Sequence, residues 1–381
     1  MRATVETRDL KLVSADRGEA ARSRGGAPLA LAALVLTAVV TATLGGADAA
    51  RRKIEVRELA ENALQMALDR GSADPEVQAT LADLRGTLGW RPLESKTRVI
   101  YASLVLGLAS SLDDMRLASF HAGRAAELSP VTVPVVRAAT LVLANTGEID
   151  RALELIRRMF GYDAGSAAET LGQVESLVLG VRLTAGIPDD VDAWMAWARW
   201  LRDDGRRDEA DDWLRRAHER WPGHLSVRVQ LASRAFARRD WGTLEALLPI
   251  DGPLPDERAA GRLHVLRGHL KLQRGDGPGA TADAETALRL DPSAGMRLLA
   301  GDLFHESGDP DRARAEWNRS LHATAREQGS TRRALLVRLG RLEDRYGRPA
   351  AALRHWQAVL ELDPQHPEAR RRVDDLSGFN R

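Results

Sequence analysis

The sequence predicts an all-α protein built from short helices that pair and stack. The clearest support lies between Val191 and Pro222, where apolar residues recur at the i, i+3, i+4, i+7 spacing of a helix. This pattern occurs on both sides of Gly205, and Pro222 ends the second run because proline cannot continue the hydrogen-bond ladder. Two such short helices cannot bury their apolar faces alone, so further copies of the unit are expected. The low aromatic content, 4%, agrees with stacked short helices.

The unit resembles the tetratricopeptide repeat (TPR), a helix-turn-helix of about 34 residues. In that family small residues stand at positions 8, 20 and 27, a turn glycine near 15 and a proline at 32. The resemblance implies a TPR-type α-solenoid, a right-handed superhelix of helix-turn-helix repeats whose concave groove holds a partner. With Val191 as position 1, the family pattern falls on Trp194, Ala198, Gly205, Ala210, Ala217 and Pro222.

Copies of the unit recur along the chain and predict a TPR array over residues 99–364. Within it, an extra helical segment near residues 165–187 is either one long helix or a degenerate pair. Small residues at positions 8 and 20 let the two helices of a unit approach closely. The expected units begin at Val99, Val133, Val191, Leu225, Gly261, Ala294 and Arg333.

Two expected units depart from the pattern. In the unit that begins at Val99, Asp113 stands where the turn glycine is expected. The unit that begins at Leu225 carries Arg239 and Leu244 in place of the turn glycine and the small residue of the second helix. Because each unit of a repeat protein is stabilised mainly by its neighbours, we expect this unit to be the least stable part of the array.

The ends of the array are expected to be shielded by helices of other sequence. Residues 51–98 read as an N-terminal helical cap, in which Asp74 and Pro75 start one helix. Residues 365–381 read as a C-terminal capping helix and tail, whose many charges suit a solvent-facing end.

The chain begins with a predicted flexible tail, residues 1–26, and an uncharged run, residues 27–47. At ~1.5 Å per residue the run can cross a hydrocarbon core of ~30 Å, which predicts a single transmembrane signal anchor. A cleaved signal peptide ending at Ala49 is the alternative. The long tail and the basic residues 51–53 favour the anchor. A buried helix of the folded domain would carry a polar stripe, which this run lacks.

The orientation of the anchor is not fixed by charge, because basic residues are balanced on its two sides. One N-terminal span before a large domain is typical of an uncleaved export signal. We therefore expect a single-pass protein of the bacterial inner membrane with a periplasmic domain. Signal cleavage would instead give a secreted or periplasmic protein.

Motifs and composition give no support to an enzyme. The chain has no cysteine, which excludes disulfides, thiol catalysis and thiolate zinc sites. No histidine belongs to an HExxH motif or to a metal-ligand pair, so no metal, cofactor or catalytic residue is predicted. His305 and Glu306 form an adjacent acid-base pair, but a solvated helix end is the simpler interpretation. The net charge of +1 argues against nucleic-acid binding, which needs a basic face.

Tryptophans gather in the unit between Val191 and Pro222, which holds five of the nine. An aromatic recognition patch is one interpretation. Core filling is favoured because Trp194 and Trp197 occupy positions where the repeat buries large residues. Trp200 falls outside those positions, so both interpretations stay open for it.

The resemblance also implies a binding surface, lined by the first helix of each unit near positions 2, 5, 9 and 12. Basic side chains dominate these positions, so an acidic protein or peptide is the expected partner, held by guanidinium groups through paired hydrogen bonds. The alternative is that these are ordinary solvated helix faces. The predicted groove residues are Met195, Arg199, Arg202, Arg262, His269, Asp302, His305, Arg341 and Asp344.

Two classes of function follow. In the first, the protein is a non-catalytic, membrane-anchored TPR scaffold that binds a protein or peptide partner and assists assembly, export or maturation in the bacterial cell envelope. In the second, it is an accessory TPR subunit of a membrane enzyme complex, such as a polysaccharide synthesis or glycosyltransferase system. The second class needs a catalytic domain on another chain, because repeats and caps use up the sequence after the anchor.

Overall fold

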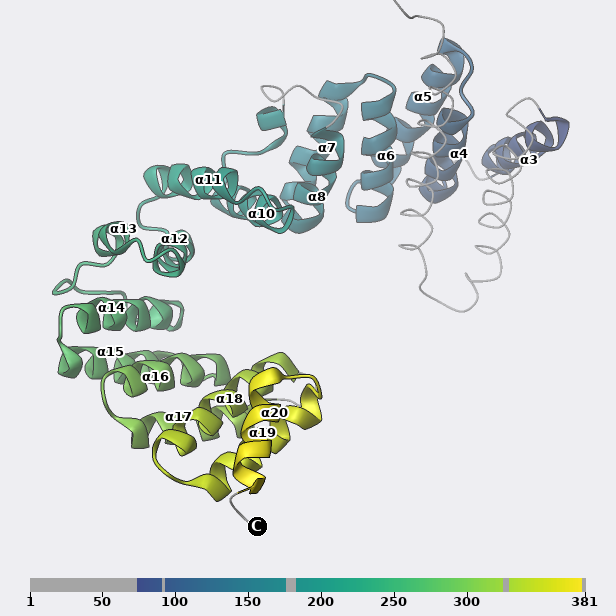
Figure 1. Ribbon diagram of the computed structural model, residues 1–381. Coiled ribbons are helices and arrows are strands. Elements are labelled where there is room, and N and C mark those ends of the chain that lie inside the picture. The colour runs from purple at the N-terminus through teal and green to yellow at the C-terminus, as the bar shows by residue number, and fades with distance from the viewer. Residues whose placement is uncertain (1–73, 91–92, 176–182, 325–328, 379–381) are drawn as a thin grey trace, which may run out of the picture. The chain divides into compact units, whose positions relative to one another are not determined.

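The computed structural model describes residues 74–90, 93–175, 183–324 and 329–378, and these residues form helices and no strand (Figure 1). This confirms the all-α fold class for the described part of the chain. The chain divides into two compact units, Met1–Trp213 (unit 1) and Leu214–Arg381 (unit 2). The boundary falls within helix α11, Arg207–Arg220.

Unit 1 is a stack in which each helix packs against the next. In addition, α4 contacts α6 and α6 contacts α8, so alternate helices also meet. Besides the short 3-10 turn η2 (Thr184–Gly186), its described helices are α3 (Pro75–Trp90), α4 (Ser95–Gly107), α5 (Leu112–Leu128), α6 (Val133–Asn145), α7 (Ile149–Phe160), α8 (Ala164–Val174), α10 (Val191–Asp203) and the first half of α11.

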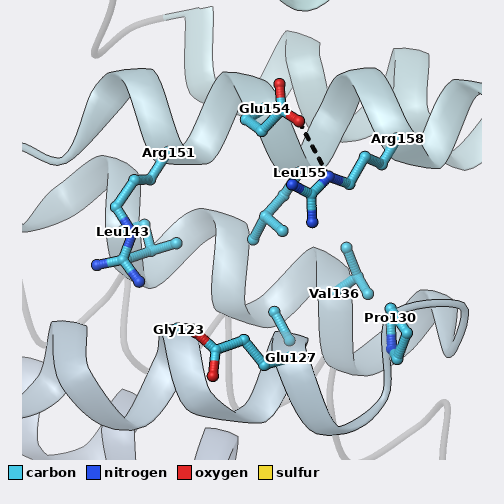
Figure 2. Close-up of a pocket in the computed structure, with 10 residues that line it drawn as sticks. Gly123, Glu127, Pro130, Val136, Leu143, Arg151, Glu154, Leu155 and Arg158 are labelled. Atoms are coloured by element: carbon cyan, nitrogen blue, oxygen red, sulfur yellow. Dashed lines mark hydrogen bonds and ion pairs between the residues drawn. The ribbon is translucent and has the colours of Figure 1, made fainter.

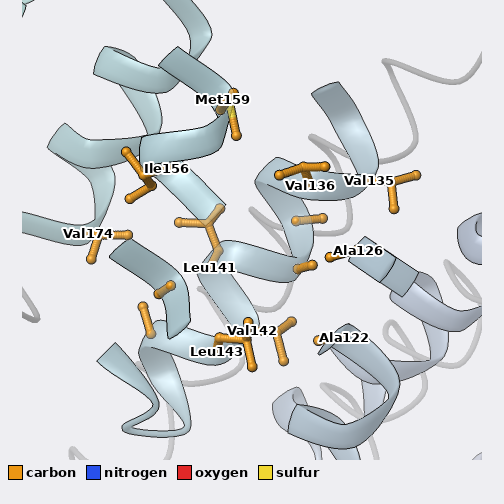
Figure 3. Close-up of a cluster of buried hydrophobic side chains, with 14 of the residues drawn as sticks. Ala122, Ala126, Val135, Val136, Leu141, Val142, Leu143, Ile156, Met159 and Val174 are labelled. Atoms are coloured by element: carbon orange, nitrogen blue, oxygen red, sulfur yellow. The ribbon is translucent and has the colours of Figure 1, made fainter. Parts of the chain in front are cut away.

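The core of unit 1 runs continuously between these helices. Figure 3 shows its centre, where α6 contributes Val136 and Leu143, α7 contributes Ile156, and α5 contributes small side chains such as that of Ala122. All four are less than 2% exposed. Small residues on α5 let α6 approach it closely, as the repeat pattern predicts.

Unit 2 repeats the same arrangement. Neighbouring helices pack in sequence order, and α14 also contacts α12 and α16, the first helices of the units on either side. Contacts restricted to near neighbours are typical of repeat proteins. Besides the 3-10 turn η3 (Arg258–Ala260), its helices are α12 (Leu225–Ala237), α13 (Trp241–Leu247), α14 (Gly261–Gln273), α15 (Gly277–Leu290), α16 (Ala294–Glu306), α17 (Pro310–Ala323), α18 (Gly329–Arg345), α19 (Pro349–Leu362) and α20 (Pro367–Gly378).

Most of the predicted units begin where a helix begins, with α6, α10, α12, α14 and α16 each starting at the predicted residue. Two helices start four residues before the predicted unit, α4 at Ser95 and α18 at Gly329. The early start of α4 has a physical reason, because Ser95 and Thr97 are buried although polar. The Ser95 hydroxyl lies 2.6 Å from that of Ser129. This hydrogen bond allows a polar residue at a buried position where the repeat pattern predicts an apolar one.

Asp113 does not replace the turn glycine, and this prediction was wrong. Asp113 lies in the first turn of α5, and the connection from α4 ends at Ser111. The Ser111 hydroxyl accepts a hydrogen bond from the Asp114 amide (3.2 Å), and the Asp114 carboxylate accepts one from the Ser111 amide (3.0 Å). This capping box starts the helix without a left-handed residue.

The other turns use a residue in the left-handed region of φ. In five units it is the predicted glycine, with φ between 65° and 90° at Gly147, Gly205, Gly275, Gly308 and Gly347. In the unit that begins at Leu225, Arg239 occupies this position with φ 57°. An L-residue with a side chain is strained there, by about 1 kcal/mol relative to glycine.

The extra segment between the second and third predicted units contains α8, which packs against α6, α7 and α10. Residues 176–182, in the middle of the predicted segment, lie outside the described residues. The contact with α10 depends on Trp200, whose ring stacks on Trp197 (centroids 4.8 Å apart) and covers Gly172 of α8. Trp200 therefore has a packing role, which favours core filling over the recognition patch.

Two further glycines, both in unit 2, lie beneath the indole ring of a tryptophan. A Cβ on Gly301 of α16 would lie 2.5 Å from the Trp317 indole, and one on Gly340 of α18 would lie 2.7 Å from the Trp356 indole. Both glycines occupy position 8 of the repeat, and both tryptophans come from the second helix of the same unit. The missing side chain lets the ring lie flat on the first helix.

The predicted flexible tail, the predicted anchor at residues 27–47 and the first part of the predicted N-terminal cap all lie outside the described residues. Among the residues that the structure does describe, no helix is long and apolar enough to span a bilayer. The roles of α3 and α20 as caps, and a right-handed superhelix, stay predictions.

The helix pair α12 and α13 carries two departures from the repeat, a strained turn and a second helix of only 7 residues. Replacing Arg239 with glycine should remove the strain and raise the free energy of unfolding of this part by about 0.5–1 kcal/mol. Hydrogen exchange of the α12 and α13 amides should slow accordingly. The control is Arg238→Gly, because Arg238 has φ −88° and gains nothing from glycine. Equal effects of the two substitutions would refute the strain argument.

Candidate functional site

A cavity of about 330 Å³ lies on the first-helix face of unit 2, between α16 and α18. Three predicted groove residues, Asp302, His305 and Arg341, line it together, although they come from different repeats. These predicted positions therefore lie on two helices that border one cavity, and their role as a binding surface stays a prediction. The full lining is Asp302, His305, Glu306, Trp317, Arg338, Arg341, Leu342 and Arg345.

The two predicted aspartates are both hydrogen-bonded within the chain, although Asp302 also lines the cavity. The Trp317 indole donates a hydrogen bond to Asp302 (3.1 Å), and the Arg338 guanidinium donates two to the same carboxylate (2.6 and 2.9 Å). Asp302 thus joins the two helices of its own unit to the first helix of the next unit. A buried indole N–H needs such an acceptor, and the carboxylate in turn needs a cation.

The same connection repeats one unit later. Asp344 accepts hydrogen bonds from the Trp356 indole and from the Arg372 guanidinium of α20, each at 2.9 Å. The Asp344 side chain is only 8% exposed. We call these two sets of contacts the Trp-Asp-Arg links, because in each of them one aspartate accepts from both an indole and a guanidinium.

Arg341 also forms an ion pair with a carboxylate of the same chain. Its guanidinium donates two hydrogen bonds to Glu368 of α20, at 2.8 and 2.6 Å. These bonds raise the pKa of Arg341 and lower that of Glu368. The Arg341 side chain is nevertheless 62% exposed, so the pair lies at the rim of the cavity and exchanges partners at low cost.

His305 and Glu306 do not form a dyad. Glu306 lies 3.0 Å from the Nδ1 atom of His269 on α14, a hydrogen bond that lowers the pKa of Glu306. The His305 ring instead packs against Trp317, with centroids 5.6 Å apart. His269 itself is 8% exposed and rests on the ring of Phe236, so it is a packing residue and does not offer a surface for a partner.

The remaining predicted groove residues do not join this cavity. Arg262 is half-buried, where burial lowers its pKa, and it donates a hydrogen bond to Ser233 (3.3 Å). In unit 1, Met195 is buried at 8% exposure, so its role as a groove residue is corrected. Arg202 pairs with the adjacent Asp203 (3.1 Å), and Arg199 is exposed.

Sequence reasoning missed two arginines of the cavity, Arg338 and Arg345. They flank Arg341 at the i, i+3, i+7 spacing that places side chains on one helix face, so the signal was present in the sequence. Arg338 is committed to Asp302. Arg345 is exposed, and among the described residues no carboxylate lies within ion-pair distance of it. It is therefore the cation of this cavity that is most available to a ligand.

Unit 1 has a cavity of its own, of about 380 Å³, between α5, α6 and α7 (Figure 2). Its floor is apolar and includes Val136, Leu143 and Leu155. Charged side chains of both signs surround it, among them Glu127 and Arg151, which Figure 2 shows on opposite walls. No predicted groove residue lines this cavity. In the part of the chain that the structure describes, no group of three or more His, Asp or Glu side chains could hold a metal ion.

The Trp-Asp-Arg link at Asp302 should contribute to the stability of unit 2. Asp302→Ala leaves the half-buried Arg338 without its carboxylate and the indole with only the Leu298 carbonyl, which should cost about 1–3 kcal/mol of unfolding free energy. The control is Glu285→Ala, which removes an exposed ion pair with Arg312 and should change stability by no more than about 0.5 kcal/mol. Denaturant titrations that give equal losses would contradict the role of the link.

No curated protein matches the chain in sequence. The chain is similar to 169 chains of solved structures, and three of these illustrate the likeness. They are the APC/C hetero-tetramer Cut9-Hcn1 (16% identity, 79% of this chain, 59% of that chain, TM-score 0.42), human IFIT1 with m7Gppp-AAAA (13%, 87%, 82%, 0.38), and the C-terminal part of a TPR repeat-containing protein of Cytophaga hutchinsonii (12%, 72%, 99%, 0.36). The chain thus spans 59% of the length of the first. These TM-scores are too low to support an argument about function.

A family comparison gives a direct match. Residues 191–234, which cover α10, α11 and most of α12, match the tetratricopeptide repeat family. This is the stretch whose residues first indicated the repeat. The match supports a TPR protein, with the repeat itself identified at residues 191–234, where the structure describes helices.

Proposed function

We propose that this protein is a non-catalytic scaffold that binds a protein or peptide partner on the first-helix face of unit 2. The observation that carries the proposal is the cavity between α16 and α18, whose rim carries Arg345, an exposed arginine for which no ion pair is found among the described residues. TPR repeats generally bind proteins, which agrees with a binding role. The details of the ligand are inferred from the side chains that line the cavity.

The cavity favours an acidic segment. Arg341 and Arg345 lie one turn apart on α18, so a carboxylate placed between them would accept hydrogen bonds from both guanidinium groups. Glu368 shows that Arg341 can bind a carboxylate, because it accepts two hydrogen bonds from this guanidinium. Leu342, which lies between the two arginines in sequence, is only 2% exposed, so recognition of a ligand would depend on the guanidinium groups.

Three further features belong to this proposal. The uncharged run at residues 27–47 would anchor the scaffold in a bacterial inner membrane with its domain in the periplasm, where it would assist assembly, export or maturation in the envelope. As an accessory subunit of a membrane enzyme complex, the protein would use the same surface. The net charge of +1 supports a protein partner over a nucleic acid.

An array of acidic peptides and their amide counterparts, with Glu and Asp replaced by Gln and Asn, tests the ligand class. The full chain should prefer the acidic members, and Arg345→Ser should weaken binding of those members about tenfold or more, because a charge-assisted hydrogen bond is lost. The control is Arg354→Ser, an exposed arginine on α19 outside the cavity, which should leave binding unchanged. Equal binding of acid and amide peptides, or by the two variants, would refute the acidic ligand.

The anchor is tested separately by fractionation. The full chain should remain with membranes after alkaline carbonate washing, and deletion of residues 27–47 should release it, because the apolar run would supply the membrane affinity. Deletion of the polar tail before the run, residues 1–26, is the matched control and should leave the chain in the membrane. A purified protein that begins at Ala50 would show that the run is a cleaved signal instead.

A further inference from the structure

Unit 1 contains a second cavity, of about 620 Å³, between α3, α4 and α5. We call it the α3 cavity. Figure 1 shows these three helices next to one another, and α4 contacts both α3 and α5. The volume falls in the range of about 300–1,000 Å³ that small-molecule sites of proteins occupy. The side chains that line this space therefore show which ligand it would accept.

One side of the α3 cavity is apolar. Val105 of α4 and Leu108 at the end of this helix are 7% and 8% exposed, and both line the space. Leu81 of α3 and Leu117 of α5 are half-buried and line it as well. These four side chains, which we call the apolar wall, come from three different segments. An apolar ligand body would contact all of them at once, and removal of this surface from water would favour binding.

The polar side of the α3 cavity contains hydrogen-bond donors without acceptors. Arg85 of α3 is exposed and forms no ion pair or hydrogen bond with the residues that the structure describes. Tyr101 of α4 is 4% exposed, and its ring packs edge-on against His121 (centroids 4.9 Å apart). Among the described residues, the Tyr101 hydroxyl has no hydrogen-bond partner. A guanidinium and a phenol can both donate to one carboxylate.

Asp114 of α5 also lines the α3 cavity, but its carboxylate is already hydrogen-bonded. It accepts from the amides of Ser110 and Ser111 (both 3.0 Å) and from the Ser111 hydroxyl (2.8 Å). The bond from the Ser110 amide, followed by those from Ser111, lowers the pKa of Asp114. This carboxylate thus serves the capping box of α5, whereas the donors of the cavity still lack a partner.

The local charge agrees with an anionic ligand. Burial raises the pKa of Tyr101, the Arg85 guanidinium lowers it, and Asp114 raises it by less than Arg85 lowers it. The pKa of the adjacent His121 is lowered to about 4 by burial and by the guanidinium groups of Arg98 and Arg85. His121 is therefore neutral at pH 7, and the surroundings of the two rings are positive. One free guanidinium suits one carboxylate, whereas a nucleic acid would need several such cations.

We propose that the α3 cavity binds a small organic anion with an apolar body and one carboxylate. The carboxylate accepts hydrogen bonds from the Arg85 guanidinium and the Tyr101 hydroxyl, and the body lies on the apolar wall. This site shares no residue with the peptide site proposed on unit 2, so it does not depend on that function.

Octanoate and octanamide test this ligand class, because they share an apolar chain and differ in charge. In calorimetric titrations of the purified full chain, octanoate should bind about tenfold more tightly than octanamide, because only the acid gains charge-assisted hydrogen bonds. Arg85→Gln should remove this preference by weakening the binding of octanoate. The control is Arg124→Gln, at a half-exposed arginine of α5 outside the lining, which should keep the preference.

Three further variants test the rest of the site, with circular dichroism to verify folding. Tyr101→Phe keeps the buried ring and removes the hydroxyl, so octanoate should bind about fivefold more weakly. Ala82→Trp places an indole at an exposed position of the lining, and it should weaken both probes about tenfold by filling the cavity. Arg345→Ser in unit 2 should change neither probe, which separates this site from the peptide site.

Three outcomes would overturn the proposal. The parent chain could bind the acid and the amide equally, which would exclude recognition of the carboxylate. The Arg85→Gln chain could bind octanoate as the parent does, which would exclude the guanidinium. The full chain could bind neither probe, which would show that the α3 cavity does not admit a ligand.

Discussion

The structure depends on glycine residues that let an indole ring lie directly on a neighbouring helix. At Gly301 and Gly340 the ring belongs to the second helix of the same unit, and at Gly172 it belongs to the following unit's first helix. An indole buried in this way must place its N–H on an acceptor. In unit 2 the acceptor is an aspartate of the first helix, and this carboxylate recruits an arginine from the next first helix or from α20. The absence of a side chain at Gly301 and Gly340 therefore permits the packing within each unit. It also permits the hydrogen bonds that connect the unit to the next helix.

Charge compensation inside the chain decides which surface residues remain available. The first helices of unit 2 are rich in arginine, yet Arg338 is committed to Asp302 and Arg341 to Glu368. Each of these pairs spans two helices, so each stabilises the stack and removes a charge from the groove. A repeat protein binds through the charges that remain after its own units are joined. In unit 2, Arg345 remains available at the centre of the candidate site, next to the exposed ion pair of Arg341 and Glu368.

The two units offer surfaces of different character. The cavity of unit 2 lies on first helices and carries a basic rim, whereas the cavity of unit 1 lies between second helices and carries both signs of charge over an apolar floor. A surface of the first kind selects a ligand by charge, and one of the second kind selects a ligand by shape.

Helix periodicity and backbone sterics are local, so the helical fold of the described residues, five of the seven repeat starts and the turn glycines with positive φ could all be predicted from the sequence. It also placed Asp302, His305 and Arg341 on faces that form one cavity. Only the tertiary structure decided the role of each residue. Asp302 and Asp344 became internal acceptors, and Met195 and His269 were buried, because contacts between units determine which polar groups find partners and which faces stay open. Sequence spacing gives the face of a helix, but the neighbouring helix determines what that face contacts.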